Sequence, residues 1–472
     1  MKKILLFIVS LSLIFVITIT IFFSKSVYES KSLEYLRSKI PVDYKEMILK
    51  KILVYRYINK LEKEIEEKEL IISQKNKVIN KISSQEDFFF QDEKFFKDKK
   101  IKVRYFKNDN FENYGPRAYF AEKDEILFLT SGTGSTYYLN TKNIDNDKVK
   151  KFSFEKINNN FEELVQEEYI LDNMTITKGT EIINNKFYLS LVNKNNEECY
   201  TNIIFVADLD LKFLKFEEFF NTKMCIPYFD NSSGGNISKF RDNKILITIG
   251  DYVWVNEELF PKNSNLSPQN PNDYLGKILS IDLDNPDNTE IFALGTRNSQ
   301  GLYFDTQTNL VFFSDHGPQG GDEVNLIKPD DILPNFGWPI VSYGEHYGFP
   351  ENKNPKFYKR APLKKPHSAY GFIEPLKYFP NQSPATSQII KANKFENYDN
   401  NLIVLYLGTL GDTNWGSKSL HKFVMNEKYE LIEEDIYNID QRIRDSIYLS
   451  QSNKIILYLE TSGSIAILDS IL

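Results

Sequence analysis

The 472-residue sequence has no excess of positive charge and contains only two cysteines. Its 58 basic residues are outnumbered by 65 acidic ones, and the lysines are interleaved with glutamate and aspartate. Phosphate binding needs clustered Lys and Arg that carboxylates do not compensate, so the net charge of −7 argues against a nucleic-acid partner. Most charged side chains are therefore expected on solvated faces of the protein.

The two cysteines are Cys199 and Cys225. If the body of the chain lies outside the cytoplasm they could pair, provided that their Cα atoms approach within bonding distance. The alternative for each is a buried, unpaired thiol. The sequence leaves both alternatives open.

No small-residue cleavage site follows the apolar run at the amino terminus. Lys2 and Lys3 precede Ile4 to Phe23, a run that matches the ~20 residues with which a helix crosses a bilayer. Residues 1–27 are therefore expected to be an uncleaved signal anchor with a cytoplasmic amino terminus. The membrane would then be a partner, and the bulk of the chain would be periplasmic, anchored to the inner membrane. A cleaved signal peptide is the alternative, although its apolar core is usually only ~7–15 residues long.

Glycine and proline are absent from Tyr44 to Ser83, where the sequence turns helical and charged. Apolar residues recur there at a three-four spacing, at Ile58, Leu61, Ile65, Ile72, Ile79 and Ile82, with Lys68 and Lys75 at two expected seam positions. The pattern predicts that residues 28–99 form a helical stalk and a linker, with a weak coiled coil that could join chains into an oligomer. The alternative is a helix packed against its own domain.

No helical pattern interrupts the rest of the chain, which changes to a period of two. A polar turn followed by a short apolar run recurs six times, beginning at Glu125, Lys186, Lys244, Asn309, Asn401 and Lys454. Repeated antiparallel units that are too short to fold singly predict an all-β, six-bladed propeller over residues 100–472. A Pro-rich insertion, Pro350–Pro384, is expected to lie on the face that builds the site.

Special residue types gather between Ala293 and Pro339. Two strand-like runs are joined there by a polar turn, so the loops before and after them should share one end of a hairpin. The first loop carries Arg297 and Asn298, and the second carries Gly317–Pro318 and Gly320–Glu323. Backbone carbonyls beside carboxylates suit a hard cation such as calcium, which takes oxygen ligands. The alternative is a pair of ordinary surface loops.

This stretch resembles a known family signature. It contains LGTRNSQGLYFD, then SDHGPQGGDEVNLI and NFGWP, and three other pieces agree with the same family: ILITIGD, LGKILSI and RIRD. The motifs are similar to those of the soluble quinoprotein glucose dehydrogenases, also called glucose/sorbosone or aldose sugar dehydrogenases. The resemblance runs from about Lys100 to the carboxyl terminus. It implies a six-bladed propeller that binds pyrroloquinoline quinone (PQQ) and calcium and oxidises a small-molecule sugar in the periplasm.

The resemblance implies roles for four residues around the cofactor. It places Arg297, as a catalytic residue, and Asn298 in the pocket for the quinone and the substrate. Arg442 and Arg444 match an Arg-x-Arg pair that meets the anionic cofactor. On a strand these two side chains would share one face, and the guanidinium fork suits carboxylates. Their alternative role is a surface salt-bridge ladder.

The resemblance also implies metal ligands. The backbone carbonyls of Gly317 and Pro318 match those on the calcium that bridges to the cofactor, where the cation polarises a quinone carbonyl. Glu323, with Asp322 beside it, matches a ligand of a second, structural calcium.

The histidine that serves this family as general base is missing. In its expected place, before the Gly-Asp strand, the sequence has Ser232 or Ser233. A serine hydroxyl is no base at neutral pH without an activating partner, and the nearby Asp230, with an ordinary pKa of about 4, would be a weaker one. His316 is expected to cap backbone groups of its loop.

Two functions follow from these residues. The retained Arg-Asn, Gly-Pro and Arg-x-Arg elements favour a PQQ- and calcium-dependent oxidoreductase acting on CH–OH groups of an aldose. The missing histidine favours a catalytically inactive propeller that binds a carbohydrate or a protein partner. The fold cannot choose between them, because function depends on the site.

Overall fold

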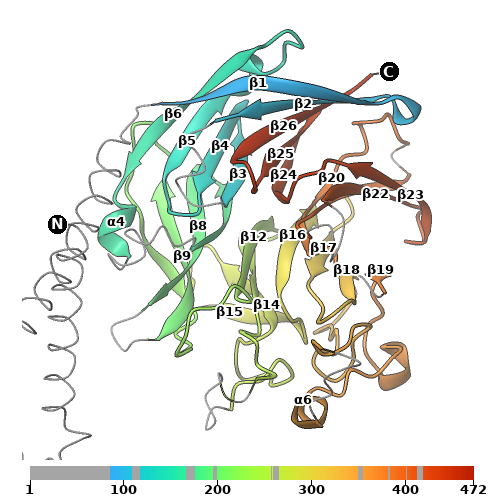
Figure 1. Ribbon diagram of the computed structural model, residues 1–472. Coiled ribbons are helices and arrows are strands. Elements are labelled where there is room, and N and C mark those ends of the chain that lie inside the picture. Colours follow the sequence, from blue (N-terminus) through green and yellow to red (C-terminus); the bar gives the residue numbers. More distant parts are fainter. Residues whose placement is uncertain are drawn as a thin grey trace, which may run out of the picture. The chain divides into compact units, whose positions relative to one another are not determined.

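The fold is seen in a computed structural model that describes most of the chain after residue 84 (Figure 1). The described residues are 85–108, 117–165, 176–194, 199–256, 258, 265–348, 355–380, 383–399, 401–411 and 418–471. Their helices are short: α4 (Phe161–Leu164), α6 (Pro355–Arg360) and the 3-10 turns η2 (Lys97–Lys99), η4 (Thr141–Asn143) and η5 (Ser368–Tyr370).

The all-β prediction agrees with this structure, but the predicted helical anchor and coiled-coil stalk are not part of the fold that it describes. No helix in the described ranges is long and apolar enough to cross a membrane, and α6, with six residues, is too short for a stalk. The predicted anchor, residues 1–27, and the helical pattern of residues 44–83 lie outside the described residues. The predictions of a membrane partner and an inner-membrane location depended on these helices. No helix in the described residues supports them, so both predictions are wrong for the fold that the structure describes.

The strands form six antiparallel groups, which we call blades 1 to 6 in chain order of their first strands. They are blade 1, β3 (Ala118–Lys123), β4 (Ile126–Ser131), β5 (Thr136–Asn140) and β6 (Lys151–Asn159); blade 2, β7 (Thr177–Ile183), β8 (Lys186–Lys194), β9 (Tyr200–Asp208) and β11 (Glu217–Asn221); blade 3, β12 (Gly234–Phe240), β13 (Lys244–Ile249), β14 (Lys277–Asp282) and β15 (Thr289–Leu294); blade 4, β16 (Ser299–Asp305), β17 (Leu310–Asp315), β18 (Asp322–Ile327) and β19 (Lys377–Phe379); blade 5, β20 (Thr386–Lys391), β21 (Ile403–Thr409), β22 (Ser419–Met425) and β23 (Leu431–Asn438); and blade 6, β24 (Ile443–Leu449), β25 (Lys454–Leu459), β26 (Ser464–Ser470) and β2 (Ile101–Lys107).

The first strands of the six blades follow one another in a closed ring. β3 lies beside β7, β7 beside β12, β12 beside β16, β16 beside β20, β20 beside β24, and β24 beside β3 again. Figure 1 shows β12, β16 and β24 on the inner side of their sheets. This is the layout of a β-propeller, in which radial repetition leaves only short sheet edges.

The amino-terminal strands close the ring. β2 pairs with β26 and so completes blade 6, while β1 (Gln85–Phe96) pairs with β2 along one part and with β6 along another. The short β10 (Phe213–Leu214) pairs in parallel with β6. The linker that the sequence predicts up to residue 99 is therefore mostly a strand. Its polar residues fit an outer strand, because one face of it meets solvent while Phe88 is fully buried in the core.

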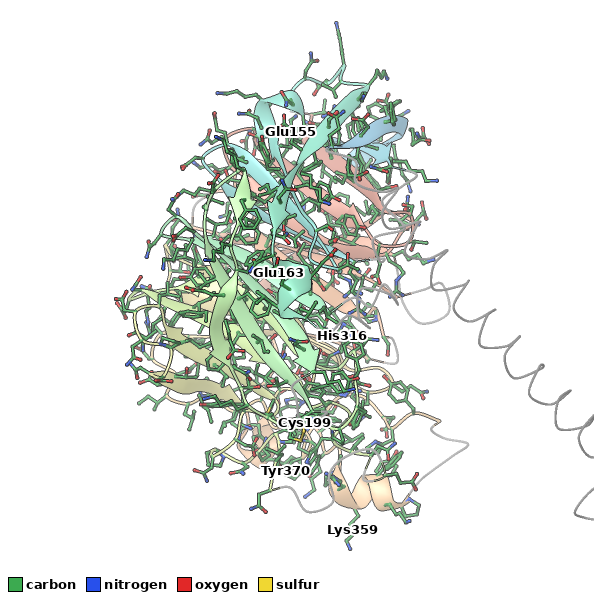
Figure 2. The ribbon with its side chains drawn as sticks, turned by 90° about the vertical axis from the view of Figure 1, so that its left-hand side faces the viewer. Glu155, Glu163, Cys199, His316, Lys359 and Tyr370 are labelled. Carbon is green, nitrogen blue, oxygen red and sulfur yellow. A yellow bond between two sulfur atoms is a disulfide. The ribbon has the colours of Figure 1, made fainter. Side chains whose placement is uncertain are left out.

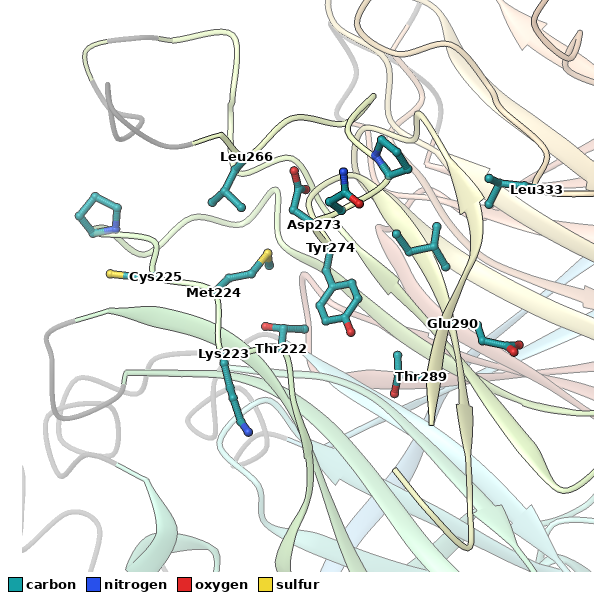
Figure 3. Close-up of a pocket in the computed structure, with 14 residues that line it drawn as sticks. Thr222, Lys223, Met224, Cys225, Leu266, Asp273, Tyr274, Thr289, Glu290 and Leu333 are labelled. Atoms are coloured by element: carbon teal, nitrogen blue, oxygen red, sulfur yellow. The ribbon is translucent and has the colours of Figure 1, made fainter. Parts of the chain in front are cut away.

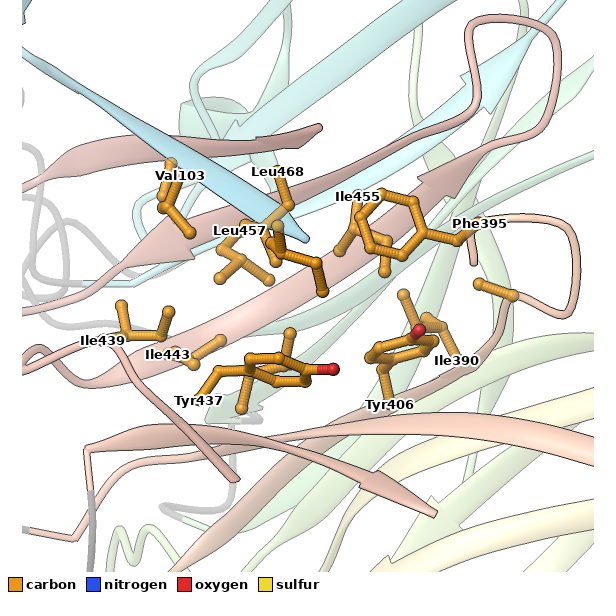
Figure 4. Packing of buried hydrophobic residues seen from close by; sticks show 14 of the residues in the cluster. Val103, Ile390, Phe395, Tyr406, Tyr437, Ile439, Ile443, Ile455, Leu457 and Leu468 are labelled. Atoms are coloured by element: carbon orange, nitrogen blue, oxygen red, sulfur yellow. The ribbon is translucent and has the colours of Figure 1, made fainter. Parts of the chain in front are cut away.

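The hydrophobic core is divided among the interfaces of neighbouring blades. One cluster joins blade 5 to blade 6, where Tyr406 and Tyr437 pack against Ile443, Ile455 and Leu457 (Figure 4). Each of these side chains is buried almost completely. Because a blade presents one apolar face to each neighbour, its strands pack only when the ring is complete.

Cys199 and Cys225 form a disulfide bond, with Cα atoms 4.6 Å apart (Figure 2). The bond ties the start of β9 to the segment after β11, where Tyr200 and Ile226 also make an isolated bridge. Of the two alternatives that the sequence leaves open, pairing is the one in the structure. The bond secures the segment that leads toward Ser232.

Candidate functional site

The predicted site begins with the loop that leads into β16. Asp315, the last residue of β17, is buried and lies opposite Ser299. Its carboxylate accepts hydrogen bonds from the backbone N–H groups of Arg297 at 2.9 Å and of Asn298 at 2.6 Å. The carboxylate therefore fixes the backbone of both predicted site residues. Asp315 stands in the recognised motif, but its role follows only from the pairing of the two strands of the hairpin.

The guanidinium group of Arg297 turns toward the loop after β17. Its Nη1 donates to the backbone carbonyls of His316 and Gly317, both at 2.9 Å, and the group lies 5.4 Å from the ring centre of Trp338. Two backbone carbonyls thus converge on one cationic group, as they would on a hard metal cation. The Nε of Arg297 is buried without a hydrogen-bond partner. The oxygen set therefore fits the predicted cation in part.

The two acidic residues of the predicted calcium loop are buried. Asp322 accepts hydrogen bonds from the backbone N–H groups of Gly317 at 2.9 Å and of Ala385 at 2.7 Å, and burial raises its pKa to about 7. Burial and then the charge of Asp315 raise the pKa of Glu323 well above its ordinary value. Buried carboxylates without a compensating cation are costly, and a bound divalent cation relieves that cost.

A complete protein ligand set is not formed, however. Among the described residues no group of three or more His, Cys, Asp or Glu side chains could hold a metal ion. Pro318 follows Gly317 with its ring close to Gly344. A cation bound here would therefore depend on backbone carbonyls and on a ligand from outside the chain.

Arg444 and Arg442 meet at one carboxylate. Nε and Nη2 of Arg444 donate to Glu460 at 3.0 and 2.7 Å, and Nε of Arg442 lies 3.7 Å from the same carboxylate. Arg117, just before β3, approaches Glu460 from blade 1 at 3.9 Å. Burial opposes ionisation of Glu460, but Arg444, Arg117 and Arg442 outweigh it and lower its pKa. Three guanidinium groups thus share one carboxylate, which leaves net positive charge.

The two halves of the site are joined by Gln300. Its side chain donates to Oδ1 of Asn298 at 2.8 Å and accepts a hydrogen bond from Nη1 of Arg444 at 3.3 Å. Oδ1 of Asn298 also accepts from the backbone N–H of Gly234, at the start of β12, at 3.2 Å. The structure therefore brings predicted residues of blades 4 and 6 together at the inner strands. Gln300 itself stands in the recognised motif, but its role in joining the two halves depends on the closed ring.

A further cation, Lys178 on β7, lies in the same region. Its Nζ is buried, has no hydrogen-bond partner, and lies 5.4 Å from the ring centre of Phe229. The charges of Arg117, Arg444 and Asp230 act on it. Lys178 and Arg117 cannot be recognised from the sequence, because neither stands in a motif and both come near the other site residues only when the ring of blades closes.

No histidine stands in the segment where the general base is expected. Asp230 accepts a hydrogen bond from the backbone N–H of Ser232, while the Oγ of Ser233 is buried without a partner. His316 places Nε2 2.6 Å from the carbonyl oxygen of Thr386. Burial lowers its pKa to about 3, so His316 is neutral. Its partner is a backbone group, but one at the start of β20 in blade 5 and not, as predicted, in its own loop.

Asp251 lies behind Arg297, at the end of the Gly-Asp motif. Its backbone N–H donates to the carbonyl of Arg297 at 2.7 Å, and its carboxylate accepts a hydrogen bond from Nε1 of Trp338 at 2.9 Å. Burial raises the pKa of Asp251 to about 6, although the charge of Arg297 opposes this shift. Asp251 and Trp338 thereby contact both each other and Arg297.

A groove of about 1200 Å³ lies away from this cluster, beside Cys225 (Figure 3). Met224 and Tyr274 line it together with residues of β15 such as Glu290. None of the predicted site residues lines the groove. The volume of a groove therefore does not identify the candidate site in this fold. The convergence of charged and polar groups identifies it.

Comparison with known proteins assigns the same region to a family. A family model for glucose/sorbosone dehydrogenases matches residues 181–466, which include every predicted site residue. Among curated proteins, the aldose sugar dehydrogenase YliI of Escherichia coli is 30% identical over 162 residues, 33% of this chain and 37% of that protein. An uncharacterised protein of Synechocystis sp. is 26% identical over 250 residues, 50% of this chain and 56% of that protein. The chain thus spans about half the length of the Synechocystis protein and less than half the length of YliI.

Solved structures agree on the fold. The soluble aldose sugar dehydrogenase of Escherichia coli in its apo form has a TM-score of 0.58 at 18% identity, covering 78% of this chain and 99% of that one. A glucose dehydrogenase has a TM-score of 0.55 at 19% identity, covering 75% and 95%. At such identities the likeness concerns the fold alone. With a family model matched over more than half of its length, the chain belongs to the glucose/sorbosone dehydrogenase family.

Proposed function

We propose that this protein oxidises a hydroxyl-bearing carbon of an aldose, using PQQ and calcium bound where the first strands of the blades meet. The observation that carries the proposal is the group of Arg117, Arg442 and Arg444 around the single carboxylate of Glu460. An excess of guanidinium groups at one point suits a ligand with several carboxylates. PQQ is such a ligand, and the family resemblance supports the choice.

The bound quinone supplies a two-electron acceptor, and calcium makes that acceptor more electrophilic. The residues present suit the carboxylates of the quinone, and they fit the cation in part. The carbonyls of His316 and Gly317 converge within 2.9 Å of one cationic nitrogen, and the buried Nε of Arg297 is a donor without a partner.

The chain's own residues would bind the cofactor and orient polar groups toward the reacting atoms. Arg442, with 35% of its side chain exposed, is accessible to a ligand carboxylate, whereas Arg444 is buried and fixed by Glu460. Asn298 and Arg297, held by Asp315, would present an amide and a fixed positive charge to the reacting atoms. Stabilisation of developing negative charge by such preorganised groups is commonly the largest part of catalysis.

A substrate of the aldose class is supported by the relative that is an aldose sugar dehydrogenase. The second candidate function is a propeller that binds a ligand without turnover. It is favoured by one observation, the absence of a histidine at Ser232 and Ser233, where the family has its base.

The test is reduction of an artificial electron-acceptor dye by the purified full-length chain, with PQQ, calcium and a panel of aldoses. Dye reduction that requires sugar, PQQ and calcium together supports the oxidoreductase. Saturable PQQ binding with no turnover on any aldose supports the binding propeller. Absence of PQQ binding contradicts the proposed function.

A further inference from the structure

Five of the six inner strands that the structure describes, β7, β12, β16, β20 and β24, carry β-bulges. Three of these bulges hold the polar side chains of Lys178, Gln300 and Arg444. The pairing register shifts between Ser299 and Gly301 in β16, and between Ile443 and Asp445 in β24. The intervening residues, Gln300 and Arg444, are hydrogen-bonded to each other. Bulges re-aim side chains and are frequent beside active sites.

Lys178 occupies the corresponding position in blade 2. The register of β7 shifts between Thr177 and Gly179, so Lys178 is the bulged residue. Its side chain therefore belongs to the same constellation as Gln300 and Arg444, approached from another blade. The charges of Arg117 and Arg444, two of the arginines around Glu460, both act on its amine.

The stem of Lys178 runs along the segment where the family base is missing. Gly235, in β12, has φ +102°, and a Cβ atom there would lie 2.4 Å from the Cβ of Lys178 and 2.7 Å from its Cγ. The preceding residue, Gly234, donates its backbone N–H to Asn298 at 3.2 Å. Gly235 thus leaves space for Lys178 beside Ser233, close to the amide of the predicted substrate pocket.

The amine is prepared to accept a proton. Lys178 is only 3% exposed, and its Nζ has no hydrogen-bond partner. Burial first, and then repulsion by Arg117 and Arg444, lowers its pKa well below the ordinary value, against the opposing charge of Asp230. Lysines that are desolvated beside other cations are neutral nucleophiles or bases in enzymes.

We propose that Lys178 is the general base of this protein and replaces the missing family histidine with an amine from the neighbouring blade. The proposal rests on the proposed function. In the step, the O–H bond at the sugar carbon breaks and its proton binds to Nζ, which becomes an ammonium group. The hydrogen on that carbon would leave with its electron pair to the two-electron acceptor that a bound quinone would supply, and the carbon–oxygen bond would become a carbonyl.

The test compares Lys178→Ala and Lys178→Arg with Lys186→Ala, a control at an exposed lysine of the same blade. Lys178→Ala is expected to lower kcat by about 10²- to 10⁴-fold, the usual contribution of a general base. Its dissociation constant for PQQ is expected to stay within threefold of wild type. Added primary alkylamines should restore turnover, increasingly with amine basicity, whereas Lys178→Arg should stay inactive because guanidinium holds its proton.

Two results would overturn the role of Lys178. One is turnover by Lys178→Ala within threefold of wild type. The other is a parallel loss of PQQ binding and turnover that no amine restores, which would make Lys178 a holder of the cofactor. If wild-type protein binds no PQQ, the proposed function itself fails, so the two failures are distinguishable.

A measurement without cofactor or turnover completes the test. NMR of protein carrying ¹³C-labelled lysine reports the titration of each amine, and the Lys178 signal is the one that Lys178→Ala lacks. Titration well below that of Lys186 supports the base. Titration together with Lys186 overturns it.

Discussion

Arg444 donates a hydrogen bond from Nη1 to the side-chain oxygen of Gln300, 144 residues earlier in the chain. This contact connects the Arg-Asn loop of blade 4 with the Arg-x-Arg strand of blade 6. Both residues stand at bulges, and Gln300 also donates a hydrogen bond to Asn298. The two sequence motifs therefore form one site only when the ring is closed.

Replacing Gln300 by Met should separate the two halves of the site. Nη1 of Arg444 loses its acceptor, and Asn298 loses a donor, at a cost of about 1–3 kcal/mol for buried groups left without partners. PQQ should consequently bind about tenfold more weakly to Gln300→Met in an absorbance titration. Gln85→Met, at an exposed position of β1, is the control and should bind like wild type. Equal affinity in both variants would contradict the connection.

The ionisation of Glu460 should make the free energy of unfolding depend on pH. Since the three arginines lower its pKa below the ordinary 4.5, its contribution is complete above pH 4.5 and is lost as the pH falls through its lower folded-state pKa. Glu460→Gln should therefore reduce the free energy of unfolding by about 3 kcal/mol at pH 7 and by progressively less below pH ~4.5. Urea unfolding at several pH values measures this difference.

The control for this prediction is Glu163→Gln, at an exposed position of α4. It should follow wild type at every pH. A difference between Glu460→Gln and wild type that stays constant down to pH 3 would mean that the charge of Glu460 is not the cause.

Gly235→Ala should disturb Lys178 specifically. Both Gly235 and Gly371 have positive φ, +102° and +80°, but an added Cβ meets Lys178 at the first and no atom within 4 Å at the second. Each alanine should cost about 1–3 kcal/mol of backbone strain. Only Gly235→Ala should also lower kcat, by an expected tenfold or more. Equal kcat values for both variants in the dye assay would show that the contact is without consequence.

The disulfide should stabilise the chain by restricting the unfolded state. Its cysteines are 26 residues apart, so loop closure predicts about 3–4 kcal/mol. Urea unfolding with and without a reducing agent measures this contribution. The double variant Cys199→Ser, Cys225→Ser should have the stability of reduced wild type and should not respond to the reducing agent. A response of the double variant would assign the effect to something other than this bond.

The repeat of short apolar runs was sufficient to predict the all-β fold. Local motifs pointed to Arg297, Asn298 and Arg444 as site residues, and the structure connects Asn298 to Arg444 through Gln300. These residues are recognisable because neighbours in sequence determine their loops. Lys178, Arg117 and Glu460 could not be found in this way. These residues come near the site only because the ring brings together inner strands from distant parts of the chain. In addition, a bulge in β7 determines the direction of the Lys178 side chain.

Strand β1 shows a different reason for failure. The residues from Gln85 to Phe96 alternate poorly and carry several charges, which indicated a linker. An outer strand needs only a few buried side chains, here Glu86 and Phe88, because the rest of it meets solvent. Its place is decided by pairing with β2 and β6, which no local pattern reveals.

The central claim is that the arginines around Glu460 bind PQQ. Equilibrium binding of PQQ to wild type and to Arg442→Gln, with calcium present, tests it most directly, because the partly exposed Arg442 can be replaced with little effect on folding. We predict saturable binding by wild type and binding at least tenfold weaker by Arg442→Gln, since a hydrogen bond to a charged group contributes about 1.5–3 kcal/mol. Failure of wild type to bind PQQ, or equal affinity in both proteins, would contradict the account.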